Sequence, residues 1–395
     1  MTMNRSRRLF LGGSAAATAV GASGIITTLG AQATTQAVTS QPPLRYGPEL
    51  GVAKLNANEN PFGPSPAALK AISEAAAQGG AYYAYPAAMR LIDMIAERHS
   101  IEKTNISLSA GSSPILSYTA LAASQKGNIL GPDLFWDTTS RAPEKQGGPE
   151  IVRVQNTAEL DIDLDAIYNA IDGSIGMVHI CNPNNPTGKI LDPKALKEFC
   201  IKASKKTLVL VDEAYNELTD APSTHTMIPL VKAGHNIVVA RTFSKIYGLA
   251  GMRVGYLIAS EQNTEWVNQY GMGNYTLNQA GLAAAIASYN DDAFLTFSKE
   301  KILQGRSMVM DAVKANGLTA LSSSTNFVFV NLGSGNAEYF RRAMAEKDIL
   351  IRGIYRSYNN WSRVSMGTIS DVQRYIDAMP EALEKMEQME KAQNV

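Results

Sequence analysis

The chain has 395 residues, with 36 basic and 36 acidic side chains and a formal net charge of zero. Hydrophobic residues make up 45%, so a sizeable core can form, and this composition excludes a disordered chain, a collagen or a disulfide scaffold. Zero net charge argues against a bulk electrostatic partner such as nucleic acid, and two cysteines, Cys181 and Cys200, exclude a disulfide framework or a cysteine-rich metal site.

The first 33 residues carry the features of an export signal. Residues 6–11 read Ser-Arg-Arg-Leu-Phe-Leu, which matches the twin-arginine pattern, and the weakly apolar segment 9–29 follows. Ala31-Gln32-Ala33 then supplies a small-x-small cleavage site. The alternative is a retained membrane anchor, but many Gly, Ala and Ser residues make this segment a poor span. We therefore expect a signal peptide over 1–33 and a flexible leader over 34–53. The protein would be periplasmic or exported and meet the membrane only during export, or cytoplasmic if the signal is not used.

Beyond the leader, apolar runs alternate with helical patterns up to about residue 290. Residues 65–78 read as a helix, with Pro66 in its first turn and two glycines at its end. The further helical patterns lie at 91–99, 114–125, 164–171, 193–204 and 229–233. Short β-like runs lie at 106–109, 128–130, 150–154, 177–181, 208–211, 237–241 and 253–259. This alternation is typical of an α/β domain with a mainly parallel sheet.

The pattern changes after residue 290. Two strands are predicted at 327–331 and 361–366, and three helices at 299–314, 337–347 and 371–388. We expect these to form a small α+β domain over 291–395. A large domain over 85–290 would precede it, and an N-terminal segment over 54–84 would join the small domain.

Three motifs follow predicted strands and carry polar or reactive groups. Residues 182–188, Asn-Pro-Asn-Asn-Pro-Thr-Gly, form a rigid loop with amide groups at its mouth, or an ordinary Asn-Pro turn. Asp212 ends a buried-looking strand, where it would reach a ligand in the crevice at the strand ends or cap a helix. Lys245 lies between two turns, with hydroxyl residues one and three positions before it and an arginine eight positions after it. A purely structural role explains this arrangement around the lysine poorly.

Together these motifs supply the groups that a pyridoxal phosphate site needs. A lysine amine forms the Schiff base, and a carboxylate pairs with the protonated pyridine nitrogen so that the ring acts as an electron sink. Hydroxyl groups, backbone N–H groups and an arginine hold the phosphate. The ordered set Asn-Pro-Thr-Gly, Asp-Glu-Ala-Tyr, Ser-Lys and Gly-x-Arg-x-Gly resembles the fold type I pyridoxal phosphate aminotransferases of class I/II. From about Lys54 to the C-terminus, the chain is most similar to their histidinol-phosphate aminotransferase group.

The resemblance implies a role for each matching residue, with a three-layer α/β fold whose large domain binds the cofactor. Lys245 would form the Schiff base, and Asp212 would pair with the pyridine nitrogen. Asn185 would bond the ring oxygen together with Tyr215, which joins Lys245 and Asp212 as a catalytic residue. The phosphate would be held by a turn and by hydroxyl and guanidinium groups, from Gly111, Ser112, Ser113, Thr242, Ser244 and Arg253.

Two aromatic contacts are also implied. The segment 132–136, Pro-Asp-Leu-Phe-Trp, departs from the family's usual Pro-Thr-Tyr. We expect Phe135 to stack on the cofactor, with Trp136 as the alternative. Tyr85 would reach the phosphate of the partner subunit, which implies a homodimer with shared active sites. The alternative is a tyrosine cluster that caps a loop.

Three residues would contact the substrate. Arg363 resembles the arginine that clamps the substrate's α-carboxylate, for which a planar guanidinium is suited. Arg352 matches a position that helps bind the substrate side chain, or is a solvated arginine at a strand end. Asn60, in the segment Asn-Glu-Asn-Pro, is the third. No metal is expected, because the four histidines show no ligand spacing.

The expected function is a ping-pong aminotransferase that moves an amino group between an L-amino acid, or a histidinol-phosphate-like amine, and a 2-oxo acid. The alternatives are another pyridoxal phosphate reaction on the same fold, such as that of a lyase, racemase or amino-acid oxidase, and a binding protein without catalysis. An export signal fits poorly with histidine biosynthesis, which is cytoplasmic. A neutral or aromatic amino acid therefore fits better than histidinol phosphate.

Overall fold

The computed structural model describes residues 44–79 and 84–393. The predicted signal peptide and most of the predicted leader lie outside the described residues, as do the tyrosines at 82 and 83. From Gly47 onward the chain forms one compact unit. Within the described ranges, no helix is both long enough and apolar enough to cross a membrane.

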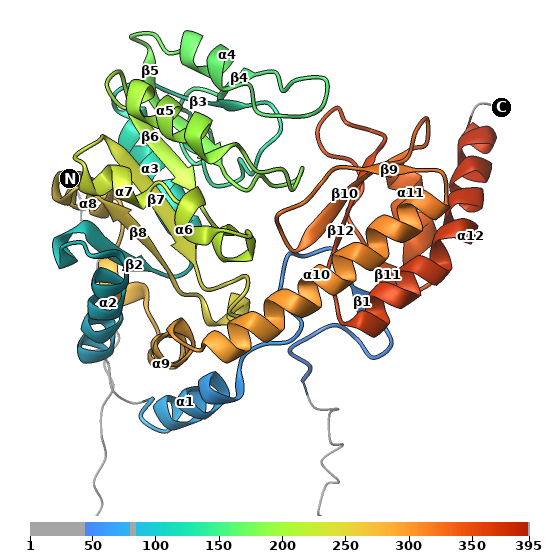
Figure 1. Ribbon diagram of the computed structural model, residues 1–395, viewed down its shortest axis with the longest axis horizontal. Coiled ribbons are helices and arrows are strands. Elements are labelled where there is room, and N and C mark those ends of the chain that lie inside the picture. The colour runs from blue at the N-terminus through green and yellow to red at the C-terminus, as the bar shows by residue number, and fades with distance from the viewer. Residues whose placement is uncertain (1–43, 80–83, 394–395) are drawn as a thin grey trace, which may run out of the picture. The chain divides into compact units, whose positions relative to one another are not determined.

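A seven-stranded sheet lies in the left part of the view in Figure 1. Its strand order is β2-β8-β7-β6-β5-β3-β4. β8 runs antiparallel to both of its neighbours, and all other pairs are parallel. The strands are β2 (Ile106–Ser109), β3 (Asn128–Pro132), β4 (Val152–Val154), β5 (Ile175–Cys181), β6 (Leu208–Asp212), β7 (Ile237–Thr242) and β8 (Gly255–Ala259). The predicted mainly parallel sheet is confirmed.

Helices cover both faces of this sheet, which explains why its central strands are apolar throughout. Along β6, Leu208 and Leu210 pack with α3 and α8, whereas Val209 and Val211 pack with α5 and α7 on the other face. This alternation follows from the two-residue period of a strand. The helices of this part are α1 (Pro66–Ala76), α2 (Tyr85–His99), α3 (Ser112–Ser124), α4 (Leu164–Asn169), α5 (Pro193–Ala203), α6 (Pro222–His225), α7 (Ile228–Lys232), α8 (Glu261–Asn268) and α9 (Gln279–Tyr289).

The C-terminal region, residues 291–395, contains two small sheets. β12 (Trp361–Ser365), β10 (Phe327–Asn331) and β9 (Thr319–Ala320) form an antiparallel sheet, and the N-terminal strand β1 (Ala53–Lys54) pairs in parallel with β11 (Ile349–Leu350). The remaining elements are the helices α10 (Asp292–Ala315), α11 (Ala337–Ala345) and α12 (Ile369–Gln393). The N-terminal segment therefore joins the C-terminal region through β1, while its helix α1 packs against α9.

Candidate active site

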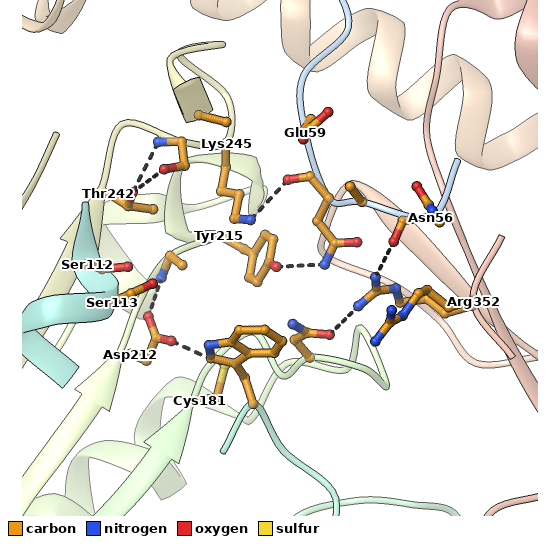
Figure 2. A pocket seen from close by; sticks show the side chains of 18 of the residues that line it. Asn56, Glu59, Ser112, Ser113, Cys181, Asp212, Tyr215, Thr242, Lys245 and Arg352 are labelled. Carbon is orange, nitrogen blue, oxygen red and sulfur yellow. Dashed lines mark hydrogen bonds between the residues drawn. The ribbon is translucent and has the colours of Figure 1, made fainter. Parts of the chain in front are cut away.

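A cavity of about 460 Å³ lies at the carboxyl ends of the parallel strands (Figure 2). Because β5 and β6 are paired in register, their last residues, Cys181 and Asp212, lie side by side. The loop after β5 supplies Asn185, and the loop after β7 supplies Lys245. The cavity brings together these predicted residues: Ser112, Ser113, Asn185, Asp212, Tyr215, Thr242, Ser244, Lys245, Arg253, Arg352 and Arg363.

Asp212 is a buried carboxylate that forms no ion pair with any residue that the structure describes. One oxygen accepts a hydrogen bond from the backbone N–H of Ala214 (3.2 Å), and the other lies 3.9 Å from the Cys181 Sγ, which can donate to it. Burial raises the pKa of Asp212 to about 6, although the Ala214 bond and the charge on Lys245 lower it. A carboxylate of this kind suits a ligand that carries a buried positive charge.

Lys245 points into the same cavity (Figure 2). Its Nζ donates a hydrogen bond to the backbone oxygen of Asn58 (3.0 Å) and lies 5.3 Å from the centre of the Tyr215 ring. Burial, and then the nearby charge of Arg363, lower the pKa of Lys245 to about 8, while Asp212 opposes the shift. A larger fraction of the amine is therefore neutral, and nucleophilic, at neutral pH than in an ordinary lysine.

We expect the modification rate of Lys245 by an acylating reagent to report this shift. In the ligand-free protein the rate should rise with pH through a midpoint near 8, because only the neutral amine reacts. Mass spectrometry of the peptide that contains Lys245 measures the rate at each pH. A midpoint near the ordinary lysine value of about 10.4 would contradict the burial of this amine.

One end of the cavity has the features of an anion site. Ser112 and Ser113 begin α3, so their backbone N–H groups lie at a helix N-terminus, where anions are stabilised. Thr242 and Ser244 line the same cavity, and their hydroxyl groups are hydrogen-bonded to each other at 2.8 Å. The Arg253 guanidinium is held by two backbone oxygens, those of Ala250 (2.8 Å) and Ala110 (3.1 Å). Hydroxyl groups, N–H groups and a guanidinium are the donors that a phosphate group needs.

Gly111 shapes this end of the cavity without lining it. A Cβ atom at this position would lie 2.2 Å from the Arg253 Nη2, so a larger residue would displace the guanidinium. Its φ of +84° also lies in the region that favours glycine. Gly111 therefore leaves room for the Arg253 guanidinium, and its own contact with the ligand stays a prediction.

Two arginines occupy the other end of the cavity. Arg363 Nη1 donates to the Asn185 Oδ1 (2.8 Å), and Arg363 Nη2 donates to the backbone oxygen of Asn56 (3.2 Å). Arg352 lies directly across from Arg363, because their backbones exchange two hydrogen bonds of 3.0 and 3.1 Å. Burial and the charge of Arg352 lower the pKa of Arg363. Like charges placed side by side destabilise a sheet, and an anion bound between the two guanidinium groups would relieve this repulsion.

Trp136, not the expected Phe135, faces the cavity. The Phe135 ring is buried and packs edge-on against His179, with 5.0 Å between the ring centres. Trp136, the next residue, lines the cavity. Neighbouring residues in an extended loop point to opposite sides, and the sequence does not show which side faces the ligand.

Asn60 and Tyr85 do not line the cavity. The Asn60 side chain is buried and donates to the backbone oxygen of Ile246 (2.6 Å) and to the Ser298 Oγ (3.0 Å). Its amide nitrogen is thus used within the protein, and its predicted role as a substrate contact is corrected. Tyr85 is 63% exposed at the start of α2.

Two residues at the cavity were missed as functional residues. Cys181 lies next to Asp212, and the pairing of two predicted strands could have indicated this. Asn58 donates from its Nδ2 to the Tyr215 Oη (2.8 Å). No local pattern reveals this contact, because the two residues are 157 positions apart.

The fold and the cavity define a pyridoxal-phosphate enzyme of fold type I, because a lysine, a buried carboxylate and an anion site converge at the carboxyl ends of parallel strands. A family model described as "Aminotransferase class I and II" matches residues 51–379. The chain belongs to this family and is a pyridoxal-phosphate-dependent aminotransferase. This assignment favours amino-group transfer over the other reactions considered above.

Individual relatives agree with the family match. A histidinol-phosphate aminotransferase of Moorella thermoacetica is 32% identical over 346 residues, which cover 85% of this chain and 87% of the relative. An aromatic amino acid aminotransferase of Thermobifida fusca is 33% identical over 323 residues, covering 80% and 88%. The crystal structure of a histidinol-phosphate aminotransferase from Sinorhizobium meliloti, in complex with pyridoxal 5′-phosphate, superimposes with a TM-score of 0.77 at 28% identity and covers 84% of this chain and 90% of that one.

Proposed function

We propose that this cavity transfers amino groups between L-amino acids and 2-oxo acids in two half-reactions. When bound, pyridoxal phosphate supplies an aldehyde that amines attack and a ring that withdraws electrons. Asp212 would hold the proton of the pyridine nitrogen, Asn185 and Tyr215 would donate to the ring oxygen, and Trp136 would face the ring. The phosphate would be held by the start of α3 together with Thr242, Ser244 and Arg253. Lys245 attaches the cofactor and moves the proton at the substrate's α-carbon as general acid and base.

The pair Arg352 and Arg363 is the observation that supports a substrate class. Arg363 is buried and binds the α-carboxylate that all donors and acceptors share. Arg352 is more exposed, and its guanidinium can pair with a second carboxylate through its edge or stack on an aromatic ring through its face. One site can therefore accept a neutral or aromatic amino acid as donor and an acidic 2-oxo acid as acceptor.

A panel of amino donors with several 2-oxo acids tests this assignment, with histidinol phosphate included because several relatives carry its name. We expect turnover with aromatic donors and an acidic acceptor. Turnover with histidinol phosphate alone, which has no α-carboxylate, would contradict it.

Variants of the two arginines should separate their roles. Arg363→Ala should lower kcat/KM by about 10²–10³-fold for every substrate, because a two-pronged charged contact is lost. Arg352→Ala should lower kcat/KM by about 10-fold or more for acidic acceptors, and less for neutral donors. Single half-reactions, followed by the cofactor's absorbance, measure each effect. Equal losses for acidic and neutral substrates in Arg352→Ala would refute the proposed division.

We also propose a homodimer with shared active sites. Tyr85 and Met272 are large, strongly exposed side chains. Tyr85 begins α2 and Met272 follows α8, and both of these helices pack against β2. A tyrosine in this position can reach the phosphate site of a second copy of the chain. Equilibrium sedimentation tests this arrangement, and a monomer at micromolar concentration would rule it out.

The export signal is a further proposal, supported by the twin-arginine pattern and the cleavage site in the sequence. The enzyme would fold and bind its cofactor before export and act in the periplasm or outside the cell. Replacement of Arg7 and Arg8 by lysines should retain the protein in the cytoplasmic fraction. An unchanged distribution between cell fractions would argue against this route.

A further inference from the structure

Asn58 makes contacts with three parts of the chain that are distant in sequence. Its Nδ2 donates to the Tyr215 Oη (2.8 Å), and its backbone oxygen accepts from the Lys245 Nζ (3.0 Å). Its Oδ1 accepts from the Ser365 Oγ (2.6 Å), at the end of β12. Asn58 is buried, and Ser365 is fully buried. One residue thus joins the two groups proposed to act on the cofactor to a strand of the C-terminal region.

The segment around Asn58 is fixed to β12 along its length. The backbone N–H of Ser365 donates to the Leu55 oxygen (2.8 Å), and Arg363 Nη2 donates to the Asn56 oxygen (3.2 Å). Arg363 and Ser365 are two positions apart on one strand, so their side chains lie on the same face. The proposed carboxylate-binding residue and the residue that holds the Asn58 side chain therefore share one rigid support.

The direction of the Asn58 amide has a consequence for Tyr215. Because the Ser365 hydroxyl donates to the amide oxygen, the amide nitrogen must face Tyr215. A phenol oxygen that accepts this bond keeps its own O–H proton for another acceptor. The arrangement therefore directs the Tyr215 proton toward a ligand in the cavity, and strengthens it as a donor.

We propose that Asn58 is a positioning residue through which β12 sets the placement of both Tyr215 and Lys245. This inference rests on the proposed function of those two residues at the cofactor. Substrate bound at Arg363 would contact the same strand that holds Asn58, so this strand links the substrate site to the two reacting groups. In this role Asn58 acts through Tyr215 and Lys245.

Two variants and one control test the proposal. Asn58→Ala removes the side-chain hydrogen bonds to both Tyr215 and Ser365. Ser365→Ala removes only the bond that orients the Asn58 amide, and Ser365 does not line the cavity. Asn326→Ala is the control: the Asn326 Nδ2 donates to the Glu59 oxygen (3.0 Å), so it holds the same segment without contacting Tyr215 or Lys245. Circular dichroism confirms that each variant is folded.

The first readout is the pH midpoint of the visible absorbance of the enzyme loaded with pyridoxal phosphate. A donor to the ring oxygen favours the deprotonated form of the bound cofactor. We expect Asn58→Ala to raise the midpoint by about half a unit to one unit, the shift that the loss of one hydrogen bond produces. Ser365→Ala should shift it in the same direction, and Asn326→Ala should leave it unchanged.

The second readout is the acylation midpoint of Lys245 in the ligand-free protein. The Asn58 carbonyl favours the charged amine, so Asn58→Ala and Ser365→Ala should both move this midpoint below 8 by loosening that contact. Unchanged midpoints in Asn58→Ala, or equal shifts in Asn326→Ala, would overturn the proposal. If the wild-type protein bound no pyridoxal phosphate, the proposed function would fail, while this second readout would still decide the role of Asn58.

Discussion

Replacement of Lys245 by alanine is expected to lower turnover by about 10⁴-fold or more, because the chain loses both its attachment to the cofactor and its general acid and base. The visible absorbance that depends on this attachment should also disappear. Steady-state kinetics and an absorbance spectrum of the purified, cofactor-treated variant measure the two losses. The fold should survive, because among the described residues the Lys245 side chain makes one hydrogen bond, to the Asn58 carbonyl.

A matched control is Lys347→Ala, which removes a lysine from a surface ion pair with Glu381. Surface pairs of this kind contribute little to stability, so this variant should keep its activity and colour. Wild-type turnover in Lys245→Ala would show that another group moves the α-proton.

Asp212→Asn is expected to have the second largest effect. The substitution keeps the shape of the side chain but removes the charge that pairs with the pyridine nitrogen. We expect kcat to fall by about 10²-fold, which corresponds to a charge-assisted hydrogen bond worth about 3 kcal/mol. Single-turnover kinetics of the first half-reaction measure this loss, and Asp212→Glu, which keeps the charge, should recover part of the rate.

The affinity for the cofactor should depend on pH in a way that identifies Asp212. The Asp212 pKa is raised to about 6 in the ligand-free protein, so the carboxyl group becomes neutral as the pH falls through this value and then attracts the pyridinium less strongly. Binding to the wild type should therefore weaken below about pH 6, and this step should be absent in Asp212→Asn. The same step in both proteins would assign it to another group.

The sequence was most informative where a reactive side chain lies at the end of a predicted strand. Asp212 and Lys245 each follow an apolar run, and parallel strands bring their carboxyl ends to one edge of the sheet. Their convergence in one cavity could therefore be predicted without coordinates. The sequence analysis missed the helix α9. Its residues are mostly small and apolar, so it has no polar face and shows no amphipathic pattern.

The orientation of individual side chains was much harder to predict. Trp136 rather than Phe135 faces the cavity, and Asn58 rather than Asn60 lines it. In each case the residues are one or two positions apart, and their directions are set by tertiary contacts such as those of Asn60 with Ile246 and Ser298. The strands β1 and β11 have only two residues each, too few for any periodicity.

Reduction of the loaded enzyme with borohydride tests the central claim most directly. The reagent fixes the bond between pyridoxal phosphate and the amine that holds it, and peptide mass spectrometry then locates the added mass. Attachment at one site, Lys245, with complete loss of activity, is the predicted result. Attachment at another lysine, or no attachment in a protein that still transfers amino groups, would contradict the assignment of this cavity as the active site.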